Sequence, residues 1–156
     1  MKNLFLVLIA LIFFIGCATS YQKNGFSGGF SETQLSEKIW KVHFKGNAQT
    51  TMERATDFCL LRSAELTLEN GYKYLAIVDE SSDTKSSNFT TPQKAYTDPY
   101  GHTTFTGGQT FTANKPRTQN TVIMLREKSE YSGIVYEAEF LVSSLREKYS
   151  SEFQKK

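Results

Sequence analysis

The stretch Ile39-Trp40-Lys41-Val42-His43-Phe44-Lys45 decides the fold that we expect for this chain. Trp40, Val42 and Phe44 alternate with two lysines and a histidine, which is the two-residue period of a β-strand with one buried face. Gly46-Asn47 ends the pattern. We therefore predict a half-buried strand over Ile39–Lys45, in a sheet that turns its other face to solvent.

The next segment carries the start and stop signals of a long helix. Thr50-Thr51-Met52-Glu53 offers a capping box, and Gly71 after Asn70 is a C-terminal stop. Apolar side chains gather on two sides of this helix: Met52, Ala55, Phe58, Cys59 and Leu66 on one, and Leu60, Leu61, Ala64 and Leu68 on the other. A helix that is apolar on two sides is covered on two sides. We expect the sheet beneath it and a further element against its outer face.

Two more strands and a second helix complete the expected domain. Strands are predicted over Lys73–Asp79, where the run is almost continuously apolar, and over Asn120–Arg126. Because a helix joins the first two strands, a right-handed crossover would make them parallel. Helical spacing predicts a C-terminal helix that covers the long one, with apolar positions at Ala138, Leu141, Val142, Leu145 and Tyr149. The predicted fold is one α/β (α+β) domain over residues 31–150, with a three-stranded mixed sheet in β-α-β-β-α order.

The segment before the first strand reads as a turn followed by a short helix. Gly25-Phe26-Ser27-Gly28-Gly29-Phe30 holds three glycines, which permit a close backbone approach, and its two aromatic side chains could pin the turn to the domain. Ser31-Glu32-Thr33-Gln34 fits a capping box and predicts one helical turn.

The N-terminus has the pattern of a bacterial lipoprotein signal. An apolar run over Leu4–Ile15 ends in Gly16-Cys17 and is shorter than the roughly 20 residues of a membrane-spanning helix. We predict that residues 1–16 are a signal peptide, that Cys17 is lipidated, and that residues 17–30 form a tether. An ordinary secretory signal with a plain thiol at Cys17, or an uncleaved anchor, are the other interpretations. By resemblance to the usual sorting pattern, Ala18 after the cysteine favours the outer membrane, since Asp there would favour retention in the inner membrane. We expect the protein on the periplasmic side of that membrane, with the cell surface as the alternative.

Composition narrows the class of protein. The formal net charge is +2, and no basic stripe points to nucleic acid. With Cys17 acylated, only Cys59 is left, so no intramolecular disulfide can form. We expect Cys59 to be buried in the helix as a small apolar side chain, with pairing between chains as the other option. Arg62 lies near the same side of the helix, and we expect it to snorkel at the sheet margin unless it is buried against a carboxylate.

Residues 80–118 form an excursion far longer than a normal loop, rich in Ser, Thr and Gly. We expect it to be mobile with some β character, and Thr103–Thr106 could pair with Gln109–Thr112 as a small hairpin. Aromatic side chains spaced by small polar ones are typical of an adaptable contact surface. The candidate partner-binding residues are Tyr96, Tyr100, Phe105 and Phe111, and the partner would be an envelope protein, peptidoglycan or a second copy. A solvated linker that contacts nothing is the alternative.

One motif would point to catalysis. Gly25-Phe26-Ser27-Gly28-Gly29 matches G-x-S-x-G, with His102 as a candidate base and Asp98 as its orienting residue. The motif lacks the strand before it and the helix after it that hold such a serine, so a membrane-tethered serine hydrolase is the alternative rather than the expectation. His43, His102 and Cys59 have no metal-ligand spacing, and we predict no cofactor. The expected role is non-catalytic: binding, structure or sensing in the envelope.

Several stretches resemble a family of small, largely uncharacterised Gram-negative bacterial lipoproteins, in which a GFSGG[FY]SETQL motif follows the lipidated cysteine. The resemblance covers residues 21 to about 80, with a weaker echo in 144–149, and does not cover the excursion. It rests on Gly25–Leu35, Trp40–Asn47, Arg54–Phe58, Leu60–Thr67 and Gly71–Tyr74. It implies an envelope lipoprotein with an α/β domain and no established activity.

Overall fold

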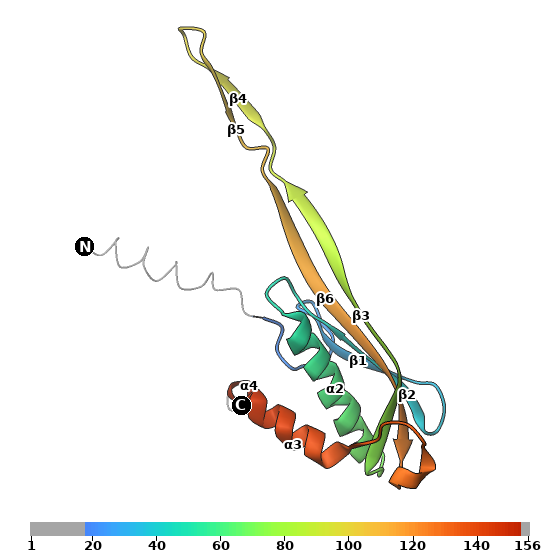
Figure 1. Cartoon of the computed structure of the whole chain (residues 1–156). Helices are drawn as coiled ribbons and strands as arrows, with labels where there is room; N and C mark the ends of the chain where they lie inside the picture. Colours follow the sequence, from blue (N-terminus) through green and yellow to red (C-terminus); the bar gives the residue numbers. More distant parts are fainter. Residues whose placement is uncertain (1–17, 154–156) are drawn as a thin grey trace, which may run out of the picture.

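The computed structural model describes residues 18–153 (Figure 1). The chain forms a body of one sheet and packed helices, from which a long two-stranded arm projects (Figure 1). In chain order the elements are β1 Gly29–Gln34, β2 Ile39–Lys45, α2 Met52–Glu69, β3 Tyr74–Thr90, β4 Lys94–Thr97, β5 Thr103–Thr106, β6 Thr110–Leu125, the 3₁₀ turn η1 Lys128–Glu130, β7 Tyr136–Glu137, α3 Ala138–Lys148 and α4 Ser150–Phe153.

The main sheet has five strands in the order β1-β2-β6-β3-β7, and each neighbouring pair is antiparallel. The predicted three-stranded mixed sheet is therefore wrong. β2 and β3 do run in the same direction, but β6 lies between them and is antiparallel to both. The reason is that β3 and β6 form one long hairpin, whose antiparallel pairing needs no crossover connection.

β1 and β7 are the two strands of the main sheet that the sequence did not predict. The segment Ser31–Gln34, predicted as a helical turn, belongs to β1, which pairs with β2 from Gly29↔Lys45 to Gln34↔Trp40. Pairing along an exposed edge of β2 satisfies more backbone groups than a single helical turn can. β7 has only two residues, which is too short to leave a periodic pattern.

Helix α2 lies where it was predicted, and both of its caps are formed. The Thr51 side chain accepts a hydrogen bond from the Arg54 backbone N–H, and Gly71 takes a positive φ of 78° just beyond the C-cap, Asn70. One face of α2 packs on the sheet, and α3 packs against α2 from another side (Figure 1). This confirms the predicted C-terminal helix and its role as a cover.

The core lies between the sheet and α2. Its members include Phe44 and Val42 from β2, Phe58 and Cys59 from α2, and Met124 from β6. Cys59 is fully buried, as expected, and its thiol donates a hydrogen bond of 3.4 Å to the Val42 carbonyl oxygen. Burial raises the pKa of the Cys59 thiol to about 12, so the thiol stays protonated at neutral pH.

The opposite face of the sheet is not covered by a helix and carries mostly polar side chains. Side chains alternate across the pleat, so Lys41, His43 and Lys45 of β2 share this face with Gln119 and Thr121 of β6. This is the solvated face that the alternation of β2 predicted. Among residues 18–153, no helix is long and apolar enough to span a membrane.

Candidate functional site

The 80–118 excursion is not a loop but the continuation of two core strands. β3 and β6 stay paired from Tyr74↔Leu125 in the body to Thr90↔Thr110, well beyond the end of β2. β4 and β5 pair next, from Lys94↔Thr106 to Thr97↔Thr103. The hairpin proposed between Thr103–Thr106 and Gln109–Thr112 is wrong, because each of these segments pairs with residues before position 98. We call residues 83–117 the arm; at about 3.3 Å per residue it reaches as much as about 55 Å from the body.

One face of the arm is a ladder of short polar side chains. Cross-strand side-chain hydrogen bonds link Ser82 to Thr118 at 3.1 Å, Ser86 to Asn114 at 2.9 Å, Asn88 to Thr112 at 3.1 Å and Thr90 to Thr110 at 2.9 Å. Such pairs on directly opposite positions stabilise an antiparallel ribbon. They account for an ordered ribbon that contains few apolar residues.

The candidate partner-binding residues all lie on the arm and are all exposed. The exposed fractions are 69% for Tyr96, 88% for Tyr100, 64% for Phe105 and 55% for Phe111. Phe89, which the sequence analysis did not include, is 66% exposed and lies directly opposite Phe111. Only the strand register reveals this pair, since the two residues are far apart in sequence.

The ribbon changes at a joint halfway along the arm. The Thr91 N–H donates to the Gln109 carbonyl oxygen at 2.9 Å, and the Gly108 N–H donates to the Thr91 carbonyl oxygen at 3.0 Å. Gly107 has a φ of 88°, and a Cβ there would lie 2.1 Å from the Pro92 carbonyl oxygen. A residue other than glycine would therefore distort the joint.

The tip of the arm is a turn built around Asp98. Its carboxylate accepts backbone hydrogen bonds from Tyr100 and His102, each at 2.9 Å, and lies 3.2 Å from the His102 ring nitrogen Nδ1. The backbone hydrogen bond from His102 is the main reason why the pKa of Asp98 is lowered. Asp98 therefore orders the turn, as Asp commonly does.

The residues of the hydrolase hypothesis are not brought together. Ser27 lies in a tight turn in which the N–H groups of Gly25 and Gly28 each bond the other's carbonyl oxygen, at 3.0 and 3.2 Å. β1 follows this turn, not a helix. His102 and Asp98 lie at the far end of the arm (Figure 1). The glycines of the motif instead serve packing, because a Cβ on Gly28 would lie 2.2 Å from the Lys45 carbonyl oxygen.

The residues directly after Cys17 are folded onto the body rather than extended as a tether. Thr19 is only 1% exposed. Its N–H donates to the Thr50 hydroxyl at 3.0 Å, and its own hydroxyl donates to the Ser27 carbonyl oxygen at 2.8 Å. The Asn47 N–H donates to the same Thr19 hydroxyl at 2.8 Å. The described part of the predicted tether thus differs from the expectation of a flexible chain.

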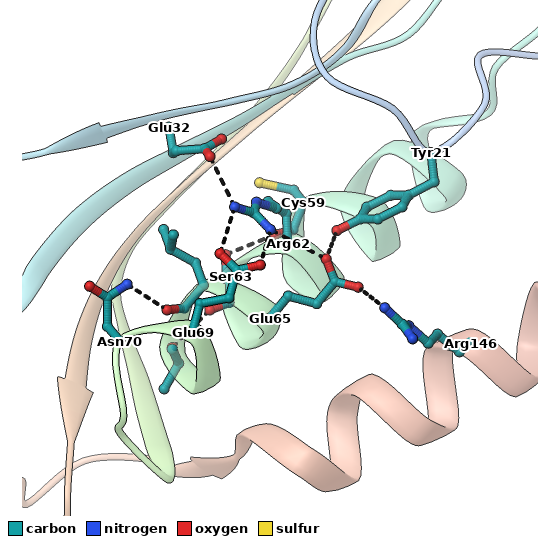
Figure 2. A network of polar contacts seen from close by, with 11 residues as sticks. Tyr21, Glu32, Cys59, Arg62, Ser63, Glu65, Glu69, Asn70 and Arg146 are labelled. Carbon is teal, nitrogen blue, oxygen red and sulfur yellow. Dashed lines mark hydrogen bonds and ion pairs between the residues drawn. The ribbon is translucent and has the colours of Figure 1, made fainter. Parts of the chain in front are cut away.

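Tyr21 extends this attachment into the core. Its ring contacts those of Phe30 and Phe58, with centroids 4.9 and 5.3 Å apart, and its hydroxyl donates to the Glu65 carboxylate (Figure 2). Burial, and then the hydrogen bond to Glu65, raise the pKa of Tyr21 above its ordinary value. The tyrosine is therefore a neutral donor that fixes the N-terminal segment to α2.

Arg62 lies at the centre of the same polar network (Figure 2). It is 8% exposed, donates two hydrogen bonds to Glu69 at 2.7 and 3.0 Å and one to Glu32 at 3.0 Å, and stacks over the Phe30 ring at 4.9 Å. Burial alone would lower the pKa of Arg62, but the bonds to Glu69 and Glu32 outweigh it and raise the pKa. The expected snorkelling is wrong: Arg62 joins α2 to β1 through buried ion pairs.

Comparisons with known proteins were made by family model, by sequence and by structure. No family model, curated protein or solved structure matches the chain. Within residues 18–153, no group of three or more His, Cys, Asp and Glu side chains is placed to hold a metal ion. Cys17, the predicted lipidation site, lies outside the described residues.

Proposed function

We propose that this protein is a bacterial envelope lipoprotein, held at the periplasmic side of the outer membrane by acylated Cys17, whose arm binds a partner protein. The role is non-catalytic. The sequence pattern around Gly16-Cys17 and the family resemblance support the anchor, and the arm supports the binding role.

The observation that carries the binding role is the combination of exposed aromatic side chains with unpaired strand edges. The Pro116 carbonyl oxygen accepts a hydrogen bond from the Gly46 N–H at 2.8 Å, at the base of the arm. Beyond that point β3 and β6 pair only with each other among the described residues, so the outer edges of 83–90 and 110–115 keep free N–H and C=O groups. Such edges recruit a further strand from another chain, and aromatic side chains add contact area at low entropic cost.

The charged residues on these edges disfavour non-specific pairing with other strands and so favour one specific partner. Lys85 and Lys115 face each other across the ribbon, and Pro116 lacks an N–H on the β6 edge. Lysine and proline on an edge strand hinder pairing with other chains in general. A partner strand that places an acidic side chain beside Lys85 would offset this repulsion.

The test is photo-crosslinking in the intact envelope of the native host. A photoreactive phenylalanine placed at Tyr96, Tyr100 or Phe105 of the full chain should give a discrete crosslinked product that mass spectrometry identifies as another envelope protein. Phe140, which is 67% exposed but lies on α3, is the matched control and should give no such product. Equal yields of crosslinked product from the arm and from Phe140 would contradict a partner protein that binds the arm. Crosslinks only to peptidoglycan fragments, or only to a second copy of the chain, would contradict it as well.

The anchor is tested separately on the mature protein. Its intact mass should show a diacylglyceryl and an acyl group on Cys17, and Cys17→Ala should remain unprocessed. A bare thiol at position 17, or acyl labelling that persists in the variant, would remove the membrane from the proposal and leave the arm unaffected.

A further inference from the structure

The turn at Gly25–Gly28 holds one aromatic side chain, that of Phe26, fully exposed to solvent. Phe26 is 110% exposed, whereas Phe30 just beyond it is buried at 8%. The hydrogen bonds between Gly25 and Gly28 hold the turn closed, so the exposed position of Phe26 is fixed by backbone structure. A single exposed ring carries no meaning by itself, and its significance here depends on the charged groups around it.

Three basic side chains surround this turn. A surface hollow is lined by Phe26, Ser27, Lys45, Lys115 and Arg117, together with adjoining backbone. Among residues 18–153, no ion pair involves any of these three cations. Their charge is therefore available to an anionic partner.

The positive surface continues from the hollow onto the uncovered face of the sheet. Lys45 lies opposite Arg117 in register, and Lys85 lies opposite Lys115. One acidic residue, Asp83 of β3, lies opposite Arg117 in register and forms no ion pair with it. The pKa of His43 on this face is lowered, first by burial and then by the positive charges of Lys41 and Lys45.

This surface adjoins the point at which the chain comes from Cys17. The Thr19 hydroxyl is bonded to the Ser27 carbonyl oxygen, and a Cβ on Gly28 would lie 3.2 Å from the Thr19 methyl group. Thr19 follows Cys17 by two residues, which span at most about 7 Å, so the turn lies close to where an acylated Cys17 would enter the bilayer.

We propose that Phe26, Lys45, Lys115 and Arg117 form a membrane-contacting surface, in which the phenylalanine enters the interfacial zone of the bilayer and the three cations bind phosphate groups of anionic phospholipids. This inference rests on the proposed lipid anchor. Aromatic side chains settle at the depth of the headgroups, and basic clusters next to a membrane anchor are attracted to anionic lipids.

The experiment uses the lipidated full chain in vesicles of phosphatidylcholine, alone or with an equal part of phosphatidylglycerol, in which a fraction of the acyl chains is brominated. Each of the variants Phe26→Trp and Tyr100→Trp adds one tryptophan to the fluorescence of Trp40. The brominated chains should quench the fluorescence added at position 26 at least about two-fold more strongly than that added at position 100, at the arm tip. Quenching of Phe26→Trp should increase with phosphatidylglycerol and decrease at high salt.

Charge reversal tests the role of the cations. Lys45→Glu combined with Lys115→Glu should abolish the effect of phosphatidylglycerol on the Phe26→Trp signal, whereas Lys94→Glu on the arm should leave it unchanged. Equal quenching at positions 26 and 100, or a response to phosphatidylglycerol that survives the double reversal, overturns the membrane-contacting surface.

Vesicle flotation separates this inference from the proposed function. A chain that floats with the vesicles but shows no quenching at position 26 overturns the contact surface and leaves the anchor standing. A chain purified from the host membrane that carries no acyl group and does not float overturns both. An unchanged thermal melt of Phe26→Trp confirms that the substituted turn is folded.

Discussion

Replacing Arg62 with methionine should destabilise the body strongly, because Arg62 is the buried cation that links α2 to β1. The substitution retains an unbranched side chain of similar length over the Phe30 ring but removes the hydrogen bonds to Glu69 and Glu32. It also removes the ion pair with Glu65 at 3.5 Å. Glu32 and Glu69 would then lose the cation that they bind, and Glu65 would keep only its ion pair with Arg146.

The magnitude follows from the exposure of these carboxylates. Removing one partner of a fully buried ion pair costs about 3–5 kcal/mol. The Glu69 side chain is 53% exposed, so water replaces much of what it loses, whereas Glu32 and Glu65 are 22% and 11% exposed. We therefore expect a loss of about 2–3 kcal/mol in the free energy of unfolding and a melting temperature lower by about 10 °C.

Urea denaturation, followed by far-ultraviolet circular dichroism, measures the loss. Arg146→Met is the matched control, because Arg146 is 53% exposed and forms one ion pair with Glu65 at 2.7 Å. That variant should lose less than about 1 kcal/mol. A double-mutant cycle of Arg62→Met with Glu32→Gln should give a coupling of about 1 kcal/mol. If Arg62→Met loses no more stability than Arg146→Met, Arg62 is not a buried link between α2 and β1.

Three further outcomes are expected. Gly28→Ala should lose about 2–4 kcal/mol in urea denaturation, because φ is 95° and the Lys45 carbonyl oxygen blocks a Cβ, whereas Gly71→Ala, with φ 78° and open space, should lose only about 1 kcal/mol; equal losses would refute the steric argument. Burial raises the pKa of Cys59 from 9.0 to about 12, so its contribution to stability is complete below pH 9 and is lost as pH rises towards 12; Cys59→Ala should flatten this decline, measured as urea midpoints across that range. Replacing 91–109 by an Asn-Gly turn should leave the melting temperature of the body within about 2 °C, since those side chains are exposed, and a larger fall in calorimetry would show that the arm supports the body.

The body was predictable where one face of an element is buried. Apolar and polar side chains alternate along Ile39–Lys45 because one face of this strand packs in the core and the other faces solvent. Helix α2 has a cap at each end that can be recognised in the sequence. The arm has no buried face, so Ser81–Asn88 shows no apolar alternation, and its strand character is set by hydrogen bonds to 112–119 that no local pattern encodes. The order of the strands in the sheet was not predicted either, because β6 lies between β2 and β3 only as a result of its long pairing with β3.

The candidate site was predictable in part. The aromatic residues of 80–118 lie exposed on the arm, as a contact surface requires, although binding itself stays a prediction. The two aromatic residues of the glycine-rich turn were expected to pin it to the domain, which Phe30 does and Phe26 does not. The difference follows from Gly28 and Gly29, whose positive φ angles reverse the chain between Phe26 and Phe30.

The burial of Thr19 determines how motion of the membrane would reach the arm. Only Ala18 separates the buried Thr19 from Cys17, so a body attached through an acylated Cys17, as proposed, would have little free chain between it and the bilayer. Because the arm is a lever of about 55 Å, a tilt of about 10° at the body moves its tip sideways by about 10 Å. In the proposed anchored protein, the distance of Tyr100 from the lipid plane would then depend on the angle between the body and that plane.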